Sequence, residues 1–355
     1  MRRPPLLARV LLARVLLASV LLTCAGVGCG GRTAGKLRVR AGHFPNITHA
    51  QGVLGHATGR FQQALGDRAT IDWKVFNAGP SAIEAIFAGD LDLTYIGPNP
   101  AINGHVRSQG QALRIVAGGC SGGAGLVVRA DSPVKTPADF VGRTLVTPQL
   151  GNTQDVAARH WLLRAGQDWQ ERGGKVRVVP LPNPEQLSLF RKGEVDGAWT
   201  VEPWVTRLVQ EAGGRILVDE GDLWPGRRYV TTHLIVARRF LDRHPELVRA
   251  FVAEHLRITD WINANRDEAA RLVNEEIRRE TGVGLPPAIL QPAFARLELT
   301  DDPVPASLVT SAQQAGALGF LGRGRVDLDG IYDLRFLNEL RAAAGKPPVT
   351  ASVRP

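Results

Sequence analysis

The chain has 355 residues, of which 44% are hydrophobic and 22% charged, a composition that excludes wholesale disorder and allows two domains or one large α/β domain. The formal net charge is +9, but four positive charges lie in the first 29 residues, which leaves about +5 for the remainder. Basic residues there alternate with acidic ones, as in RRFLDRHPE, so we expect a solvated surface that does not bind nucleic acid but mildly favours anionic ligands.

The first 29 residues have the pattern of an export signal. Four arginines and no acidic residue come first, and residues 15–28 are uncharged and mostly apolar. These fourteen residues are too few to span a bilayer comfortably, but they suit the hydrophobic region of a signal peptide. The sequence therefore predicts an exported protein, located in the periplasm or at the cell surface.

Cys29 follows small residues and precedes two glycines, an arrangement that resembles the lipidated cysteine of bacterial lipoprotein signals. We expect a lipid anchor at Cys29 that holds the protein at the membrane, followed by a linker over residues 30–36. Lipidation at Cys24 and simple cleavage of the signal are the alternatives. Gly26 stands where such signals usually carry an aliphatic residue, which keeps these alternatives open.

Beyond the signal, short apolar runs alternate with amphipathic segments. Strands are predicted at 37–43, 71–76, 91–96, 113–117, 125–129, 144–147, 176–181, 197–201 and 215–219. Helical patterns lie between them at 48–65, 80–90, 100–110, 152–166, 183–194 and 202–213. This alternation predicts an α/β fold with largely parallel sheets.

The order of elements repeats once along the chain. Residues 37–120 and 125–219 share one sequence of strands and helices, and the segments AIFAGDLDLTYIGP and LFRKGEVDGAWTVEP are its clearest echo. Two similar lobes are therefore expected. From Leu234 the pattern becomes almost wholly helical, with a helix start at Pro245 and a break at 265–267. Further helices are predicted near 286–297, 306–318 and 334–344, before a loose tail.

Small polar residues follow several predicted strands, in the loops 43–50, 97–100, 120–123, 148–155 and 200–204, and a further such segment, 229–234, precedes the final helices. Open α/β sheets bind ligands beyond the carboxyl ends of their strands. Helix N-termini at such positions present free backbone N–H groups and a partial positive charge, which stabilise anions. Since these loops contain no arginine, an anion site there would depend on dipoles and neutral donors.

Each candidate residue has a structural alternative. Thr48, Asn99 and Asn152 could be N-caps, and Asp155 could complete a cap at the third helical position. His49 and His233 could contact a ligand or occupy polar positions in the core. Glu202 could form an ion pair, repel unsuitable anions or bind an amine, and the ion pair is the interpretation we favour.

The sequence carries no motif of a familiar enzyme class, since it lacks G-x-S-x-G, a Walker loop, HExxH and CxxC. Its eight histidines are dispersed without metal-ligand spacing. After processing at Cys29, Cys120 has no disulfide partner, and its small neighbours indicate a buried structural thiol. We therefore expect a binding protein without catalysis, cofactor or metal.

Seven segments stand out in chain order: RAGHFPNITHAQGVLG, YIGPNPAINGHVRS, SGGAGLVVRADS, TPQLGNTQDVAARHWL, GEVDGAWTVEPW, TTHLIVARRFLDRHPELV and IYDLRFLNELRAAAGKPP. Together they resemble the aliphatic-sulfonate, nitrate and taurine class of ABC-transporter substrate-binding proteins, and the aliphatic-sulfonate group most of all. The resemblance extends over nearly all of residues 37–348.

The resemblance implies a type II periplasmic-binding-protein fold, with two α/β lobes joined by a two-crossover hinge and a helical C-terminal region. Lobe 1 would comprise residues 37–126 and 234–348, lobe 2 residues 127–233, and the tail residues 349–355, with crossings near 125–128 and 231–236. The ligand contacts that it implies map onto Asn46, Thr48, His49, Asn99, Ser121, Gly122, Gly151, Asn152, Thr153, Glu202 and Thr232.

The function implied is that of the extracytoplasmic solute-binding component of an ABC importer. As a monomer, it would bind a small organosulfonate or related oxyanion between its lobes and deliver it to a membrane permease. A sulfonate suits the loops because it stays ionised near neutral pH and needs only donors. The alternatives are an enzyme on the same fold, with His49 or Cys120 as the reactive group, and a sensory lipoprotein that does not transport.

Overall fold

The computed structural model describes residues 36–322 and 326–351, and it separates the chain into a short unit, Met1–Leu37, and a compact unit, Arg38–Pro355. The predicted signal sequence with Cys24 and Cys29, and the predicted linker up to residue 35, lie outside the described residues. In the part that is described, no helix has both the length and the apolar composition needed to cross a membrane.

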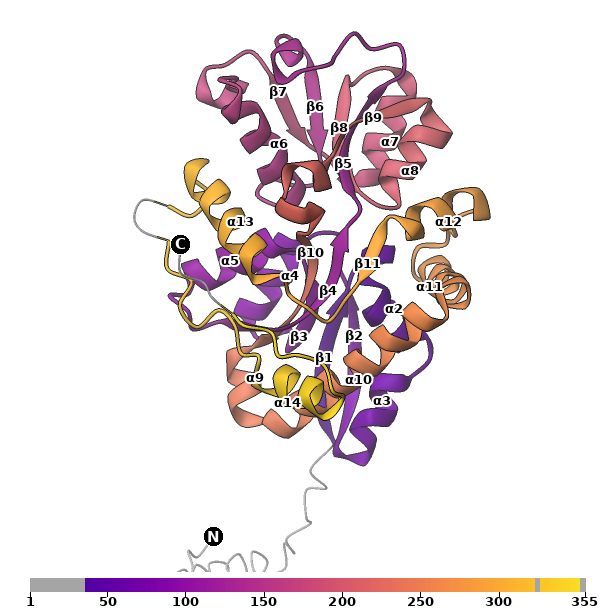
Figure 1. Cartoon of the computed structure of the whole chain (residues 1–355), viewed down its shortest axis with the longest axis vertical. Coiled ribbons are helices and arrows are strands. Elements are labelled where there is room, and N and C mark those ends of the chain that lie inside the picture. The colour runs from indigo at the N-terminus through magenta and orange to yellow at the C-terminus, as the bar shows by residue number, and fades with distance from the viewer. Residues whose placement is uncertain (1–35, 323–325, 352–355) are drawn as a thin grey trace, which may run out of the picture. The chain divides into compact units, whose positions relative to one another are not determined.

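Six strands form the first sheet, in the order β11-β4-β10-β3-β1-β2 (Figure 1). β1 and β3 are parallel, whereas β10 is antiparallel to β3 and β4, and β11 is antiparallel to β4. The strands are β1 (Leu37–His43), β2 (Ala69–Val75), β3 (Leu93–Ile96), β4 (Leu113–Gly122), β10 (Val230–Ala237) and β11 (Leu297–Leu299).

Five strands form the second sheet, in the order β7-β6-β8-β5-β9. β6 is parallel to β7 and β8, and β5 is antiparallel to β8 and β9. The strands are β5 (Ala124–Arg129), β6 (Thr144–Thr147), β7 (Arg177–Pro180), β8 (Gly197–Val201) and β9 (Gly214–Asp219). Both sheets are therefore mixed, and the prediction of largely parallel sheets is wrong, because β5, β10 and β11 run against their neighbours.

Helices flank both sheets. Those between the strands of the first sheet are α2 (Ala50–Ala57), α3 (Arg60–Leu65), α4 (Gly79–Ala88) and α5 (Pro98–Arg107). The second sheet carries α6 (Thr153–Arg164), α7 (Asn183–Lys192) and α8 (Trp204–Ala212). After β10 come α9 (Arg238–Arg243), α10 (Pro245–Ala264), α11 (Arg266–Thr281), α12 (Pro287–Ala295), α13 (Pro305–Ala317) and α14 (Arg335–Ala343).

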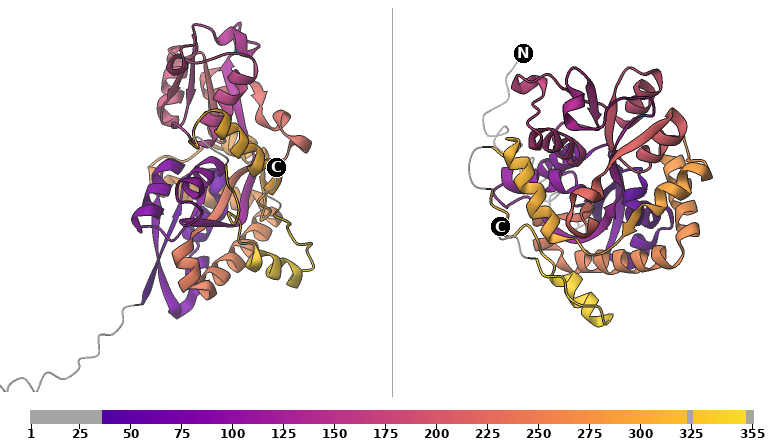
Figure 2. Two further views of the ribbon diagram at one scale, coloured as in Figure 1. Left: turned by 90° about the vertical axis from the view of Figure 1, so that its left-hand side faces the viewer. Right: turned by 45° about the horizontal axis from the view of Figure 1, so that its top comes forward.

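The C-terminal region returns to the first sheet. Helices α10 and α11 pack on α2 and α3, and β11 extends the sheet beside β4. Figure 2 shows these orange segments beside the indigo and purple N-terminal elements. This agrees with the expectation that the helical region after β10 completes the first half of the fold.

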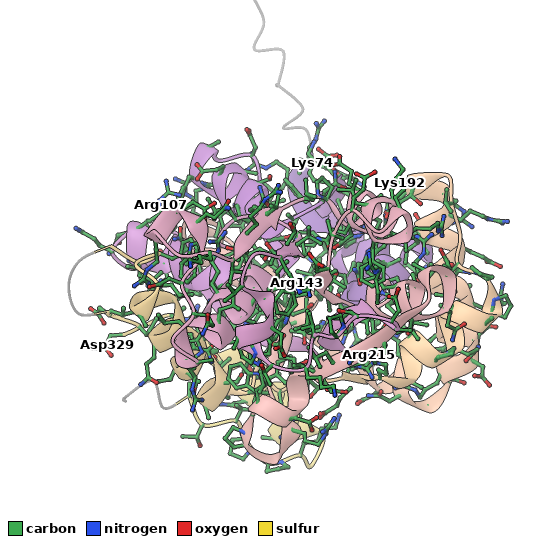
Figure 3. The ribbon with its side chains drawn as sticks, turned by 90° about the horizontal axis from the view of Figure 1, so that it is seen from above. Lys74, Arg107, Arg143, Lys192, Arg215 and Asp329 are labelled. Carbon is green, nitrogen blue, oxygen red and sulfur yellow. The ribbon has the colours of Figure 1, made fainter. Side chains whose placement is uncertain are left out.

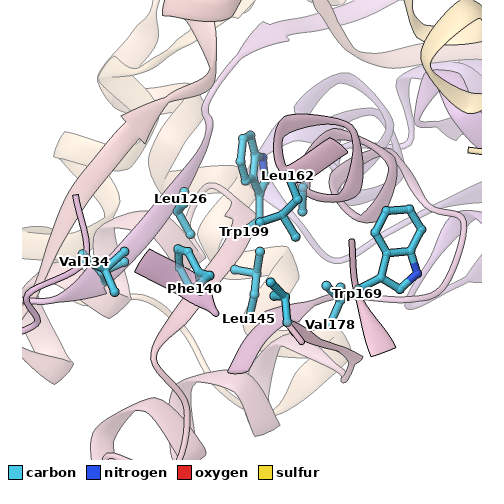
Figure 4. Close-up of a cluster of buried hydrophobic side chains, with 11 residues drawn as sticks. Leu126, Val134, Phe140, Leu145, Leu162, Trp169, Val178 and Trp199 are labelled. Atoms are coloured by element: carbon cyan, nitrogen blue, oxygen red, sulfur yellow. The ribbon is translucent and has the colours of Figure 1, made fainter. Parts of the chain in front are cut away.

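The second sheet is covered by helices on both faces. Successive side chains of a strand point to opposite faces, so neighbouring residues contact different helices. Leu126 and Trp199 pack with α6 on one face, whereas Val127 and Ala198 pack with α7 and α8 on the other. Figure 4 shows the first of these clusters around Leu145 and Trp199. A sheet covered on both faces explains why its strands read as continuous apolar runs in the sequence.

The chain passes between the sheets twice, at Gly123 between β4 and β5, and over residues 220–229 between β9 and β10. The predicted crossings at 125–128 and 231–236 instead lie inside β5 and β10. The chain thus moves from one sheet to the other a few residues before the predicted lobe boundaries at 126/127 and 233/234. The division into two lobes that close on a hinge stays a prediction.

Residues 229–234 were predicted to be a polar loop and the chain from Leu234 onward to be helical, and both predictions are wrong for residues 230–237. They form β10, whose eight residues are all buried between β3 and β4. The reason is tertiary: β-branched residues such as Val230, Thr231 and Thr232 suit a central strand, while the apolar run after them continues into α9 without a turn signal.

Lys74, Arg107, Lys192 and Asp329 are charged residues labelled in Figure 3. Arg107, for example, pairs with Glu84 at 2.8 Å, and both side chains are more than half exposed. Exposed pairs of this kind contribute little to stability. Their mixed signs agree with the solvated surface expected from the sequence.

Glu220 is a buried carboxylic acid beside the core of the second sheet. It lies in a 3-10 helix, η5 (Glu220–Leu223), and its Oε2 accepts a 2.7 Å hydrogen bond from Trp199 Nε1. Burial raises the pKa of Glu220 to about 7, although hydrogen bonds from Trp199 and Trp224 oppose the shift. The folded protein therefore holds a proton that the unfolded chain releases near pH 4.5.

We expect the free energy of unfolding to fall as pH rises through this window, because the native state binds more protons than the unfolded state. The contribution of Glu220 is roughly 3 kcal/mol between pH 4.5 and pH 8. Glu220→Gln should remove that slope in urea titrations, while Glu194→Gln, at an exposed position, should keep it. Equal slopes in the wild type and Glu220→Gln would contradict the assignment.

Candidate functional site

The loop after β1 forms a short 3-10 helix, η1 (Ile47–His49), which Asn46 caps. Asn46 Oδ1 accepts hydrogen bonds from the backbone N–H and the hydroxyl of Thr48, both at 2.9 Å. Both residues are buried. The N-cap here is therefore Asn46, and the predicted capping role of Thr48 is wrong, because Thr48 lies inside η1 and donates to the cap. The 3-10 helix η1 packs against β4 and β10.

His49 is a neutral donor in this loop. Its ring stacks on Phe44 with 4.3 Å between centroids, and Nδ1 accepts from the Phe44 backbone N–H at 3.3 Å. Burial, reinforced by His43, keeps the pKa of His49 well below its usual range. Because Nδ1 acts as an acceptor, the ring proton resides on Nε2, which is a donor suited to an anion.

Ser121 and Thr232 lie on neighbouring strands near the end of β4. Thr231 donates from its hydroxyl to the Gly122 carbonyl at 2.6 Å, and Gly122 has a φ of +82°, which favours glycine. The Thr232 hydroxyl is buried and has no hydrogen-bond partner among the described residues. It is thus an unsatisfied polar group next to the predicted loops.

His233, one position further along β10, has a structural role. Its Nε2 lies 3.0 Å from the Pro303 carbonyl oxygen, and burial lowers its pKa to about 4. The ring is fully buried. Of the two interpretations left open for His233, the structure supports the polar core position.

The N-termini of α5 and α6 meet although they belong to different sheets. A methyl group built on Gly97, the residue before α5, would lie only 2.5 Å from Thr153 Oγ1, at the first position of α6. The same methyl group would lie 3.7 Å from the Thr231 carbonyl oxygen. Two helix N-termini that point at one region add their partial positive charges there.

Both helix starts are well ordered by hydrogen bonds. Asn152 caps α6 by accepting from the Asp155 N–H at 2.8 Å, and Gly151, with a φ of +72°, donates its N–H to Asp155 Oδ2 at 2.9 Å. Asn99 in the first turn of α5 donates to the Ser311 carbonyl at 3.4 Å. Capping is therefore confirmed for Asn152, whereas the Asn99 amide connects α5 to α13.

Asp155 is fully buried and its negative charge is compensated. It accepts from the Thr147 hydroxyl at 2.7 Å and pairs with Arg159 Nε at 3.0 Å, one helical turn along α6. Arg159 also lies over the Trp169 ring. Sequence reasoning did not identify this ion pair, although its i, i+4 spacing on a helix was a usable signal.

Glu202 forms the ion pair that the sequence favoured. It is fully buried, accepts from the Thr206 N–H and hydroxyl, and lies 2.8 Å from Arg296 Nε. Burial raises its pKa although Thr206 and Arg296 oppose the shift. Arg296 also pairs with Asp219 at 3.1 Å, so this cluster joins the segment after α12 to the ends of β8 and β9.

All nine non-glycine residues predicted to contact ligand are at most 9% exposed. Two cavities described in the structure, of about 330 and 630 Å³, are lined by other residues. The larger one is bordered by Arg228, Arg266 and Arg341.

Comparison with known proteins gives the family context. The model of the NMT1-like family matches residues 32–275. The taurine-binding periplasmic protein of Escherichia coli (strain K12) is 26% identical over 199 residues, which are 56% of this chain and 59% of that protein. A second E. coli protein, designated an aliphatic sulfonates-binding protein, is 24% identical over 282 residues, 78% of this chain and 83% of its own length.

Solved structures agree on the fold. The alkanesulfonate-binding protein SsuA from Xanthomonas axonopodis pv. citri, bound to MOPS, matches with a TM-score of 0.67 at 20% identity, over 83% of this chain and 97% of that one. The desulfurization enzyme DSZB matches with a TM-score of 0.59 at 20% identity, over 87% and 100%. The predicted periplasmic-binding-protein fold is therefore confirmed, and the chain belongs to the NMT1-like family.

Proposed function

We propose that this chain is the extracytoplasmic solute-binding component of an ABC importer, and that it binds a small organosulfonate or related oxyanion between its two sheets. The observation that carries the proposal is the approach of the α5 and α6 N-termini at Gly97 and Thr153. An anion held there would contact elements from both halves of the fold. Such shared contacts favour the closed arrangement and so couple binding to closure.

The electrostatics favour an oxyanion that needs donors only. His49 is neutral and carries its proton on Nε2, and the Asp155 charge is compensated by Arg159. The helix N-termini supply partial positive charge without a full cation. A sulfonate remains ionised and unprotonated near neutral pH, so every oxygen can accept, which matches this set of donors. The names of the taurine- and sulfonate-binding relatives support the same class of ligand.

The ligand class can be tested by isothermal calorimetry with ethanesulfonate, taurine, nitrate, bicarbonate and sulfate. We expect a sulfonate to bind most tightly. Thr153→Val should weaken it about tenfold, since a hydrogen bond to a charged group is worth about 1.5–3 kcal/mol, and should leave the melting temperature nearly unchanged. Thr310→Val on α13, whose hydroxyl bonds the Ala306 carbonyl, is the matched control and should not change affinity.

A folded sample that binds none of these anions would contradict the proposal. Equal sulfonate affinity in the wild type and Thr153→Val would instead contradict the position of the site, since the hydroxyl at the start of α6 would then play no part. The two outcomes are distinguishable because the second requires measurable binding.

The protein would be exported, anchored by a lipid on Cys29, monomeric, and partnered by a membrane permease. The positively charged and then apolar N-terminal pattern supports export, and the names of periplasmic relatives agree with it. Metabolic labelling with palmitate tests the anchor: label that persists after Cys29→Ala would exclude this cysteine as the acceptor.

The cleft would bind its ligand without reacting with it. The likeness to the desulfurization enzyme DSZB makes catalysis the alternative. However, Cys120 is fully buried and burial raises the pKa of its thiol, so a thiolate nucleophile is disfavoured. His49 is buried too, with Nδ1 engaged by the backbone. Incubation with alkanesulfonates and aromatic sulfinates should leave them unchanged, and turnover of either would contradict this assignment.

A further inference from the structure

Three side chains that are far apart in the sequence converge behind the loop that follows β1. His43 Nε2 lies 3.1 Å from Glu280 Oε1, and His56 Nδ1 lies 3.2 Å from the same oxygen. The two ring nitrogens are 3.3 Å apart. The three atoms thus form a nearly equilateral triangle that joins the end of β1, helix α2 and the last turn of α11.

The size of this triangle matches a tetrahedral zinc site. Zinc bonds to histidine nitrogen and carboxylate oxygen are about 2.0–2.2 Å long, which puts adjacent ligand atoms of a tetrahedron about 3.3 Å apart. The three observed separations lie within a few tenths of an ångström of that value. A zinc ion could therefore bind all three atoms with little movement of the side chains.

The hydrogen bonds around the triangle also suit a metal. His43 Nδ1 faces the Phe44 carbonyl oxygen at 3.2 Å, the outer-shell arrangement that fixes a metal-binding tautomer. Both ring nitrogens of His43 thus face acceptors, an arrangement that is satisfied either by a doubly protonated ring or by a metal ion on Nε2. The Glu280 side chain is only 7% exposed, and its buried Oε2 has no hydrogen-bond partner among the described residues.

The residues around the triangle bury it on one side, leave it open to solvent on another and add a second carboxylate. The Trp73 ring packs against His43 and His56, with centroids 5.4 and 5.1 Å away. The His43 side chain is fully buried, whereas that of His56 is 30% exposed, so an ion can enter from its side. Glu276 Oε1 lies 3.5 Å from His56 Nδ1 and is near enough to become a fourth ligand.

We propose that His43, His56 and Glu280 form a zinc site, with Glu276 or a water molecule as the fourth ligand. Two imidazoles and a carboxylate at tetrahedral separations favour Zn²⁺ over Mg²⁺ or Ca²⁺, which prefer all-oxygen sites with more ligands. The ion would fix β1, α2 and α11 together. Because Phe44 follows His43 directly, the bound ion would also restrict the motion of the loop that carries Asn46 and Thr48.

No sequence pattern indicates this site, and the dispersed histidines predicted no metal. Glu280 lies 224 residues beyond His56 along the chain, so no short ligand motif exists. Only the packing of α11 on α2 brings the residues together.

The test is zinc binding by tag-free protein that has been freed of metal with a chelator. Calorimetry with Zn²⁺ alone should give one ion per chain and a raised melting temperature, with no comparable response to Mg²⁺. Glu280→Gln and His56→Ala should each weaken zinc binding by more than about 100-fold, because even outer-shell substitutions cost 10- to 100-fold. His244→Ala is the matched control, since its side chain is also 30% exposed and lies 3.9 Å from Glu246, and it should bind zinc like the wild type.

Cobalt substitution provides a readout that does not depend on stability. Co²⁺ should give the intense visible absorption of a tetrahedral complex in the wild type and in His244→Ala, and lose it in Glu280→Gln. Folded wild-type protein that binds no zinc would mean a hydrogen-bonded cluster only and would overturn the proposal. Zinc binding unchanged by both Glu280→Gln and His56→Ala would overturn it as well. Neither result depends on which anion the protein binds.

Discussion

Replacing Gly97 by alanine is expected to weaken sulfonate binding by about 10- to 100-fold. The backbone at Gly97 has φ −67° and ψ 158°, which alanine adopts without strain, so the cost arises across the interface. There the new methyl group would lie 2.5 Å from Thr153 Oγ1 when the α5 and α6 N-termini meet. Overpacking of this kind costs about 1–3 kcal/mol, which corresponds to the stated loss of affinity.

A double-mutant cycle separates this clash from a simple loss of helix capping. Alanine is a poorer N-cap than glycine, so Gly97→Ala should also lower stability slightly in any background. In a Thr153→Ala background the clash is absent, and adding Gly97→Ala should change affinity by no more than about twofold. Calorimetry on the wild type, the two single variants and the double variant gives the coupling free energy between positions 97 and 153. If Gly97→Ala weakened binding equally in both backgrounds, the approach of the two helix N-termini would not govern closure.

Arg296→Ala is expected to destabilise the protein by about 3 kcal/mol at neutral pH, because it leaves the buried Glu202 carboxylate without its cation. Glu202 is fully buried, and among the described residues the hydrogen bonds from Thr206 would remain to stabilise its charge. Since burial already raises the pKa of Glu202, losing Arg296 should raise it further. The loss of unfolding free energy in Arg296→Ala should therefore become smaller as pH falls and Glu202 becomes protonated.

Urea unfolding of three variants tests this account. Arg296→Met combined with Glu202→Gln should recover most of the lost stability, because it removes both charges. Arg271→Ala is the control: Arg271 pairs with Glu268 and Glu275 on the surface of α11, and losing it should have no measurable effect. An Arg296→Ala protein as stable as the wild type would show that Glu202 is neutral or solvated in the native state.

Much of the fold could be predicted because the signals are local. The strands at 37–43, 144–147 and 197–201 have the predicted bounds, since each is an apolar run flanked by turn residues. Pro245 begins α10 and the chain restarts at Arg266 as α11, as expected from capping patterns. β10 could not be predicted, because its position between β3 and β4 depends on residues more than 100 positions away.

The candidate site was predictable in its parts but not in its assembly. The role of Asn152 as a cap follows from its place before a helical segment, whereas at η1 the predicted cap Thr48 is replaced by Asn46 two residues earlier. The contacts that unite the site join distant residues, such as Gly97 with Thr153 and Glu202 with Arg296. No local pattern encodes these pairs, since tertiary packing alone brings them together.

A crystal structure of the protein with bound ethanesulfonate would locate the ligand. We expect the sulfonate group between the N-termini of α5 and α6, with its oxygens within hydrogen-bonding distance of donors from both halves, Thr153 among them. A sulfonate bound instead in the cavity bordered by Arg228, Arg266 and Arg341 would contradict the proposed site.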